Sequence, residues 1–241
     1  SVLLRSESAA SSQIENLTAS ARAIAEAELP GVKAKRNAEM IVANTYAMQA
    51  AVDLSEKVDA DAILAMHRAL MAREPRHTPG EFRTEPVWIG DGSSPVGATF
   101  VGPRHELVPD AIRDLVAFTQ RTDIPVLPQI AVAHAQFETI HPFTDGNGRT
   151  GRALAQAMLR NKGLTRQVTV PVSAGLLADT AAYFDALTSY RRGDAAPIID
   201  RFAAAALLAI ANGRELIVEL HDIRGNWNER VTARTDSAVW R

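Results

Sequence analysis

Apolar and polar residues alternate with the period of an α-helix along most of this chain. Between Leu127 and Ile140, apolar residues recur every three or four positions, which is typical of a helix with one buried face. The same spacing resumes from Ala153 to Leu159. Similar patterns predict further helices over residues 12–28, 35–53, 59–71, 109–120, 176–191 and 196–214. The sequence therefore predicts an all-α fold.

One segment, residues 79–102, interrupts the helical pattern. Val87–Ile89 and Thr99–Val101 are short runs of β-branched and aromatic residues. Between them, residues 91–95 read Asp-Gly-Ser-Ser-Pro, a composition typical of a turn. These features predict a small β-hairpin, which on this evidence alone is either a peripheral flap or part of a site.

Length and composition narrow the class of protein. A chain of 241 residues is long enough for one sizeable core, or for one domain with an accessory piece. The net charge of −2 provides no basic field for nucleic acid or membranes, and the chain has no cysteine for disulfides or thiol chemistry. The chain contains no apolar run of membrane-spanning length. Its opening five residues, Ser-Val-Leu-Leu-Arg, are too few to form a signal peptide. We expect a cytoplasmic protein whose start has been trimmed, since the first residue is not Met.

The candidate chemistry is concentrated in residues 141–152, which read His-Pro-Phe-Thr-Asp-Gly-Asn-Gly-Arg-Thr-Gly-Arg. Pro142 and Gly146 end the helix before this segment, and a second helix follows it. Residues 145–148 are therefore predicted to form a tight loop that leads into a helix. The N–H groups at the start of a helix attract anions, and glycine permits close approach of a ligand.

Four side chains in this segment suit phosphate chemistry. Arg149 and Arg152 lie three residues apart on one helical face, and guanidinium groups bind phosphate oxygens in pairs. Asp145 offers a hard oxygen ligand for Mg²⁺, and His141 can act as a general base near neutral pH. Taken singly, each is more often a packed histidine or a solvated charge, but their spacing around Gly146, Asn147 and Gly148 favours a nucleotide site. Phe143 is expected to anchor the loop in the core.

Two common nucleotide motifs are excluded. Residues 146–151 fit the pattern G-x-G-x-x-G, but a helix precedes them, whereas a dinucleotide-binding unit requires a strand there. The phosphate-loop pattern G-x-x-x-x-G-K-[ST] does not occur. His67 and the other histidines show no metal-ligand spacing, so we expect His67 to be a packed residue.

Residues 141–152 resemble the signature of Fic-domain proteins, H-P-F-x-[D/E]-G-N-G-R-x-x-R, at every defined position. The resemblance implies transfer of AMP from ATP to a Tyr, Thr or Ser hydroxyl of a protein. It implies that His141 is the base and that Asp145 binds Mg²⁺. Gly146, Asn147 and Gly148 would line the anion hole, and Arg149 and Arg152 would hold the phosphates. The related Doc toxins, which phosphorylate, carry a lysine at the position of Gly148.

A second resemblance lies near the N-terminus. Residues 11–16, Ser-Ser-Gln-Ile-Glu-Asn, fit the pattern [S/T]-x-x-x-E-[G/N] of the inhibitory helix of Fic proteins. It implies that Glu15, flanked by Ser11 and Asn16, pairs with Arg152 and displaces the terminal phosphate of ATP. The segment from Ser12 to Glu15 also fits a capping box at a helix start, and the two interpretations are compatible.

The resemblance assigns expectations to three further segments. The hairpin would dock a target protein by strand addition, and Tyr183, beside Phe184, would border the adenine pocket or simply belong to the core. In similar Fic proteins, a winged-helix module follows the C-terminal linker. The sequence stops at Arg241, so this module is either absent or was cut off, and nucleic acid would be bound only through it. Self-modification and a homodimer are compatible with the sequence.

These expectations divide the chain into three parts: an N-terminal segment with the inhibitory helix (1–30), a helical Fic catalytic domain with its flap (31–215), and a C-terminal helix or linker (216–241). The leading hypothesis is a Mg²⁺- and ATP-dependent protein adenylyltransferase inhibited by Glu15. One alternative is a hydrolase that removes AMP at the same site. Another is a nucleotide-sensing regulatory module linked to a DNA-binding domain.

Overall fold

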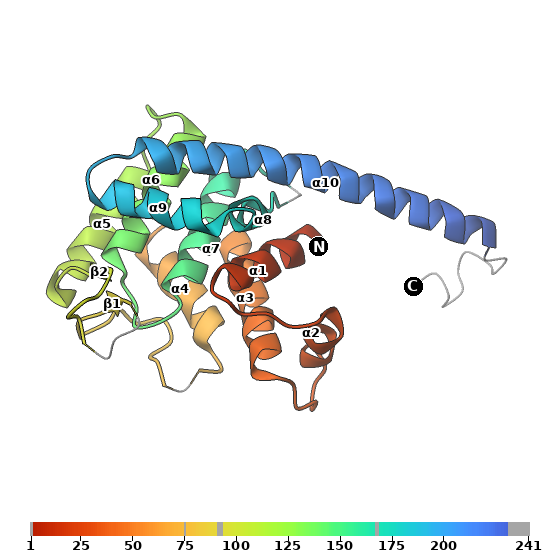
Figure 1. Ribbon diagram of the computed structural model, residues 1–241, viewed down its shortest axis with the longest axis horizontal. Helices are drawn as coiled ribbons and strands as arrows, with labels where there is room; N and C mark the ends of the chain where they lie inside the picture. Colours follow the sequence, from red (N-terminus) through yellow and green to blue (C-terminus); the bar gives the residue numbers. More distant parts are fainter. Residues whose placement is uncertain (1, 75, 91–93, 167–168, 231–241) are drawn as a thin grey trace.

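The computed structural model describes residues 2–74, 76–90, 94–166 and 169–230, and it is largely helical (Figure 1). The predicted all-α fold is confirmed. The elements, in chain order, are α1 (Val2–Ile14), α2 (Ala21–Ala27), α3 (Arg36–Asp53), α4 (Ala60–Met71), β1 (Trp88–Ile89), β2 (Phe100–Val101), a 3₁₀ turn (His105–Leu107), α5 (Val108–Thr119), α6 (Val126–Ile140), α7 (Asn147–Asn161), α8 (Val172–Leu177), α9 (Thr180–Arg191) and α10 (Ala196–Arg230).

The centre of the fold is the pair of helices on either side of the motif. α6 and α7 pack on each other, and α3, α4 and α1 cover other sides of α7. α7 is buried from its first residue to Leu159, the glycine at position 148 being only partly covered. A helix surrounded in this way presents its N-terminus at a fixed position, which suits it to hold a site.

The N-terminal helix differs from the prediction. One helix over 12–28 is wrong, because α1 covers Val2–Ile14 and a separate short helix, α2, follows it. Asn16 adopts a left-handed conformation (φ 59°) just beyond the end of α1, and Ser20 caps α2 by accepting a hydrogen bond from the Ala23 N–H. The capping-box interpretation of Ser12 is also wrong, since the Ser12 hydroxyl donates to the Ser8 carbonyl within α1 (2.9 Å).

The predicted hairpin is present. β1 and β2 are antiparallel, with Trp88 opposite Val101 and Ile89 opposite Phe100. Each strand has only two residues, and the Thr99 N–H extends the ladder by donating to the Ile89 carbonyl (2.8 Å). Residues 91–93 of the predicted turn lie outside the described residues. We call residues 84–90 and 94–103 the flap.

The C-terminal helices also depart from the prediction. The helix expected over 176–191 is two helices, because Asp179 begins α9 by accepting a hydrogen bond from the Ala182 N–H. α10 runs to Arg230, well beyond residue 214. Its first half packs on α6, α8 and α9, and its second half extends beyond the other helices (Figure 1). The predicted segment 216–241 is therefore helical up to Arg230, and its last eleven residues lie outside the described part.

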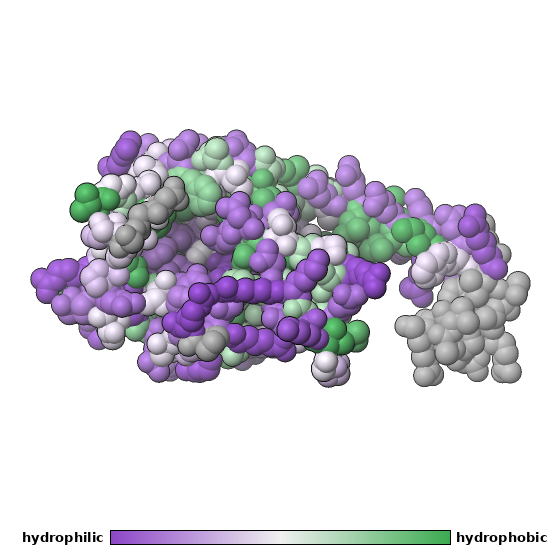
Figure 2. Space-filling model, turned by 60° about the horizontal axis from the view of Figure 1, so that its bottom comes forward, coloured by the Kyte–Doolittle hydropathy of each residue, from purple (hydrophilic) through white to green (hydrophobic). Residues whose placement is uncertain are grey.

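The projecting half of α10 exposes apolar side chains, which appear as a green patch on that arm in Figure 2. They include Ile217, Leu220, Ile223 and Trp227. Within the described ranges, no helix combines the length and the apolarity needed to cross a membrane.

Candidate active site

The motif loop is held by its own residues. His141 ends α6 in a left-handed conformation (φ 50°), and Gly146 begins α7 in another (φ 75°). Across the loop, the side chain of Asn147 in α7 accepts a hydrogen bond from the Phe143 N–H (2.9 Å) and donates one to the Phe143 carbonyl (2.8 Å). The Asn147 amide therefore serves to close the loop.

His67 of α4 contacts the same loop at Phe143 and Asp145. Its ring stacks on Phe143, which is buried in the core as expected, with ring centroids 3.7 Å apart. The Gly80 N–H donates to Nδ1 of His67 (2.9 Å), which leaves Nε2 protonated to donate to the Asp145 carbonyl (3.1 Å). Burial lowers the pKa of His67 to about 4, so this ring is neutral and its two hydrogen bonds are fixed. The sequence indicated a packed histidine but not this role.

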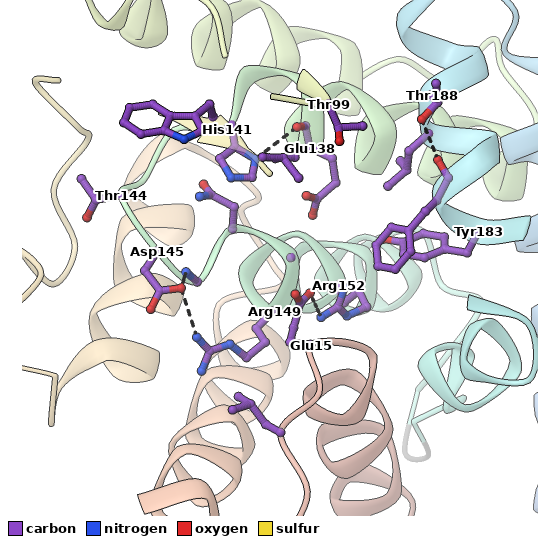
Figure 3. Close-up of a pocket in the computed structure, with 18 of the residues that line it drawn as sticks. Glu15, Thr99, Glu138, His141, Thr144, Asp145, Arg149, Arg152, Tyr183 and Thr188 are labelled. Carbon is purple, nitrogen blue, oxygen red and sulfur yellow. Dashed lines mark hydrogen bonds and ion pairs between the residues drawn. The ribbon is translucent and has the colours of Figure 1, made fainter. Parts of the chain in front are cut away.

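A cavity of about 640 Å³ opens over the motif loop (Figure 3). Every site residue predicted from the motif lines it, as do Glu15 and Tyr183. The flap contributes Trp88, Ile89 and Thr99. The structure thus brings together residues from the turn after α1, the flap, the motif loop, α7 and α9.

The imidazole of His141 faces this cavity as a neutral group. Its Nδ1 lies 3.3 Å from the Glu138 carbonyl, which can only accept, so Nδ1 carries the proton and Nε2 has a free lone pair. Burial lowers the pKa of His141 to about 4, and nearby Arg191 and Arg83 contribute. A neutral imidazole with an unprotonated Nε2 is the form that can accept a proton.

The two arginines of the motif are both buried but differ in their partners. Arg149 approaches Asp145 (Nη2 to Oδ1, 3.6 Å), while its buried Nε has no hydrogen-bond partner among the described residues. Arg152 donates from Nε to the Ser11 hydroxyl (2.9 Å) and from Nη2 to the Ser11 carbonyl (2.8 Å). Its Nη2 also donates to Oε1 of Glu15 (2.7 Å). Burial alone would lower the pKa of Arg152, but the Glu15 carboxylate raises it above the usual value.

Glu15 enters the cavity from the turn after α1 (Figure 3). Its carboxylate lies against Gly148, where a Cβ atom would overlap Oε1. Asn16 makes this possible through the left-handed turn that ends α1, and its own side chain is not among the residues lining the cavity. The predicted pairing of Glu15 with Arg152 is present in the structure, and Ser11 adds two hydrogen bonds to Arg152 that the sequence did not predict.

The donor set fits a cation that arrives with phosphates rather than a resident metal. Among the described residues, no group of three or more His, Cys, Asp or Glu side chains could hold a metal ion. Asp145 provides one carboxylate at the rim of the cavity, and Oδ1 already accepts from the Gly146 N–H (2.6 Å). A single carboxylate with phosphate oxygens is a common arrangement for Mg²⁺. His77, which the sequence did not indicate, lies beside it, with Nε2 3.6 Å from Oδ2 of Asp145.

Tyr183 is buried, and its hydroxyl lies 2.7 Å from Nε2 of His134, so it belongs to the core as well as to the cavity wall. The sequence also missed Glu138, which lines the cavity three residues before His141. Burial raises the pKa of Glu138 to about 7, and its Oε1 has no partner in the described part of the chain. Its helical spacing from His141 is the signal by which it could have been found.

Comparison with known proteins agrees with this geometry. Residues 57–159 match the model of the Fic/DOC family. The chain is 30% identical over 144 residues to protein adenylyltransferase fic-1 of Caenorhabditis elegans, which covers 60% of this chain and 26% of that protein. It is 28% identical over 188 residues to protein adenylyltransferase Fic of Nematostella vectensis, which covers 76% of this chain and 41% of that protein. The chain thus spans between about a quarter and two fifths of the length of these relatives.

The fold is shared with solved structures. A Fic family protein from Desulfovibrio desulfuricans G20 superimposes with a TM-score of 0.71 and 26% identity, over 91% of this chain and 66% of that one. A fragment of Fic-1 from C. elegans gives a TM-score of 0.62 at 24% identity, over 87% of this chain and 62% of that one. This similarity supports the fold alone. The motif, the fold and the family match agree: residues 57–159 match the Fic/DOC family, and the helices around them adopt the fold of solved Fic proteins.

Proposed function

We propose that this chain is a protein adenylyltransferase that transfers AMP from Mg·ATP to a Tyr, Thr or Ser hydroxyl of a protein. The observation that carries the proposal is the position of the neutral His141 beside a phosphate cradle in one cavity. The names of the relatives in C. elegans and N. vectensis support the same activity.

The cavity has the groups that a triphosphate needs. The N-terminus of α7 offers backbone N–H groups that no residue within the helix can bind. Arg149 offers a buried Nε without a partner in the described residues, and a phosphate oxygen would satisfy it. Asp145 would hold Mg²⁺, which would neutralise part of the phosphate charge when bound.

The reaction follows from the lone pair on Nε2 of His141. Nε2 takes the proton from the acceptor hydroxyl as its oxygen attacks the α-phosphorus. A bond forms between that oxygen and phosphorus, the bond from phosphorus to the bridging oxygen of the β-phosphate breaks, and pyrophosphate leaves. Arg149 and the N–H groups of α7 stabilise the charge on the phosphate oxygens, while Arg152 is suited to hold the terminal phosphate.

The acceptor segment would dock on the flap. In the described part of the chain, β1 and β2 form a two-stranded sheet, and an extended peptide would add to one of its outer edges by main-chain hydrogen bonds. Because main-chain pairing reads little sequence, this docking suits acceptors of varied sequence, a hydroxyl of a second copy included.

Glu15 would inhibit this reaction. Its carboxylate occupies Arg152 and the space next to Gly148, so ATP would bind without its terminal phosphate in the productive place. Two carboxylate oxygens are removed in Glu15→Gly, and we expect a severalfold or greater rise in AMP transfer with little change in stability.

The test is incubation with ATP labelled at the α-phosphate, followed by gel analysis and mass spectrometry. We compare the wild type, Glu15→Gly, Glu15→Gly/His141→Ala, and a control variant, Glu56→Gly, in an exposed turn away from the cavity. We expect Glu15→Gly alone to label protein strongly, and His141→Ala to abolish that label. If Glu15→Gly labels no protein in the presence of Mg²⁺, the proposal is wrong.

The reverse reaction is a second candidate, favoured by one observation. The side chain of Glu15 is 37% exposed inside a cavity that also contains His141, so its carboxylate can orient a water molecule. A hydrolase of this kind would release AMP from a modified protein in the wild type and not in Glu15→Gly. The opposite order of activities supports the transferase.

A further inference from the structure

Arg83 is buried although it lies in a loop, in the segment that leads from α4 to the flap. Its side chain reaches four backbone carbonyls and has no ion-pair partner among the described residues. Nε donates to the His141 carbonyl (2.8 Å), and Nη1 donates to the Glu85 carbonyl (2.9 Å). Nη2 donates to the Pro103 carbonyl (2.6 Å) and more weakly to that of Ile140 (3.4 Å).

These carbonyls belong to three separate parts of the site. Ile140 and His141 end α6 and carry the base, Glu85 precedes β1, and Pro103 follows β2. One guanidinium group therefore joins both stems of the flap to the backbone of His141. The main chain adds one more tie, since the Arg83 N–H donates to the Pro142 carbonyl (2.9 Å).

The hairpin within the flap is short. A two-stranded hairpin with two residues per strand is marginally stable by itself. At its far side, the guanidinium of Arg191 lies 4.0 Å above the ring of Phe100, which is a weaker contact. Hydrogen bonds from a charged donor to buried carbonyls are stronger than neutral ones, and the planar fork fixes their directions.

We propose that Arg83 is a positioning residue that sets the flap, and any acceptor segment docked on it, relative to the imidazole of His141. Its catalytic consequence rests on the proposed function, whereas its effect on the flap does not. The acceptor oxygen and Nε2 of His141 must meet within hydrogen-bond reach, and a displacement of about 1 Å can lower a rate by about 100-fold.

The test uses Arg83→Gln and Arg83→Lys in the Glu15→Gly background, with Arg104→Gln as the matched control. Arg104 is an exposed residue next to Pro103, and its side chain pairs only with Glu106 among the described residues. Lysine keeps the charge but reaches at most one or two of the four carbonyls, so it serves if the glutamine variant does not fold. The acceptor is an excess of a His141→Ala copy of the same chain, or a protein that the parent labels better.

We expect both Arg83 variants to lower kcat/KM for the acceptor by about 100-fold, with ATP affinity within about twofold of the parent. We also expect faster backbone hydrogen exchange that is confined to the flap. Arg104→Gln should change neither measurement. A purely structural role would instead lower ATP affinity and acceptor labelling together and raise exchange throughout the core helices, and that result would overturn the proposal.

The two proposals fail in different ways. If the parent Glu15→Gly labels no acceptor, the adenylyltransferase proposal is wrong, and hydrogen exchange still decides whether Arg83 holds the flap. If the parent is active and flap exchange in Arg83→Gln equals that of the parent, the positioning role is wrong while the activity stands.

Discussion

The contact between Glu15 and Gly148 shows how closely single residues constrain one another in this cavity. A methyl group at position 148 would overlap the Glu15 carboxylate and approach Nη1 of Arg152 (3.1 Å). The guanidinium end is flexible, whereas the carboxylate is held by Arg152. Glycine at this position is therefore required by the docked state of Glu15.

A double-mutant cycle tests this constraint. In the wild type, we expect Gly148→Ala to lower the free energy of unfolding by about 1–3 kcal/mol, because the overlap must be relieved. In the Glu15→Gly background, the same change should be neutral or stabilising by up to about 1 kcal/mol, because alanine favours a helix. Urea denaturation measures all four chains. Equal effects in the two backgrounds would show that Gly148 and Glu15 are independent.

The lowered pKa of His141 predicts the pH dependence of the reaction. A base must be unprotonated, and a pKa of about 4 keeps His141 unprotonated down to about pH 5. At pH 5.5 an ordinary histidine would retain roughly a tenth of its neutral form. We therefore expect kcat/KM of Glu15→Gly to stay nearly constant from pH 8 to 5.5, with folding followed by circular dichroism. A midpoint near pH 6.5 would contradict a buried neutral imidazole.

Among the elements, α8 and α10 are packed unusually closely. A Cβ atom at Gly175 of α8 would overlap the backbone of Ala205 in α10. α8 also holds α1, since the Ser173 N–H and hydroxyl both donate to the buried Glu7 carboxylate (2.8 and 2.6 Å). The chain of contacts α10–α8–α1 therefore reaches the helix that carries Glu15.

Alanine at two glycines tests this arrangement. We expect Gly175→Ala to destabilise the protein by about 1–3 kcal/mol or more, since neither helix backbone can yield easily. It should also raise AMP transfer, because α1 loses part of its support. Gly213→Ala in α10 is the matched control: nothing lies within 4 Å of its Cβ, and it should be neutral or slightly stabilising. Thermal unfolding and labelling measure both effects, and similar results for the two variants would contradict the packing.

The way α1 packs explains why its helical pattern was missed. Its buried face consists largely of small and polar residues, Glu7, Ser8, Ser11 and Ser12 among them. Asn44 of α3 donates to the Ser8 carbonyl (2.9 Å) and the Ser12 hydroxyl (3.0 Å). A periodicity of apolar residues cannot detect a helix that is held mainly by hydrogen bonds.

At the scale of the whole molecule, the sequence predicted what depends on local pattern. The helices with apolar faces, the hairpin and the loop of residues 141–152 follow from spacing and from turn residues such as Gly146. The site also depends on residues outside the cavity wall that no local pattern connects to the motif. Arg83 and His77 are examples, because their roles arise from loops that meet the motif only in the folded chain. The pairing of Glu15 with Arg152 could be predicted only because residues 11–16 carry their own motif.

Arg152 is also held by Ser11 of α1, and this second contact has a consequence for the proposed inhibition. Two of its hydrogen bonds go to Ser11, and neither involves the Glu15 carboxylate, so we expect both to remain in Glu15→Gly. In the proposed mechanism, the N-terminal segment would therefore have two opposite effects: Glu15 would block the terminal phosphate, while Ser11 would hold the Arg152 guanidinium in place. Both a deletion of residues 1–19 and Glu15→Gly remove the Glu15 carboxylate, but only the deletion also removes Ser11. We therefore expect the deletion to transfer AMP more slowly than Glu15→Gly. Labelling rates of the two chains, compared at equal helicity, would reveal whether the hydrogen bonds between Arg152 and Ser11 matter.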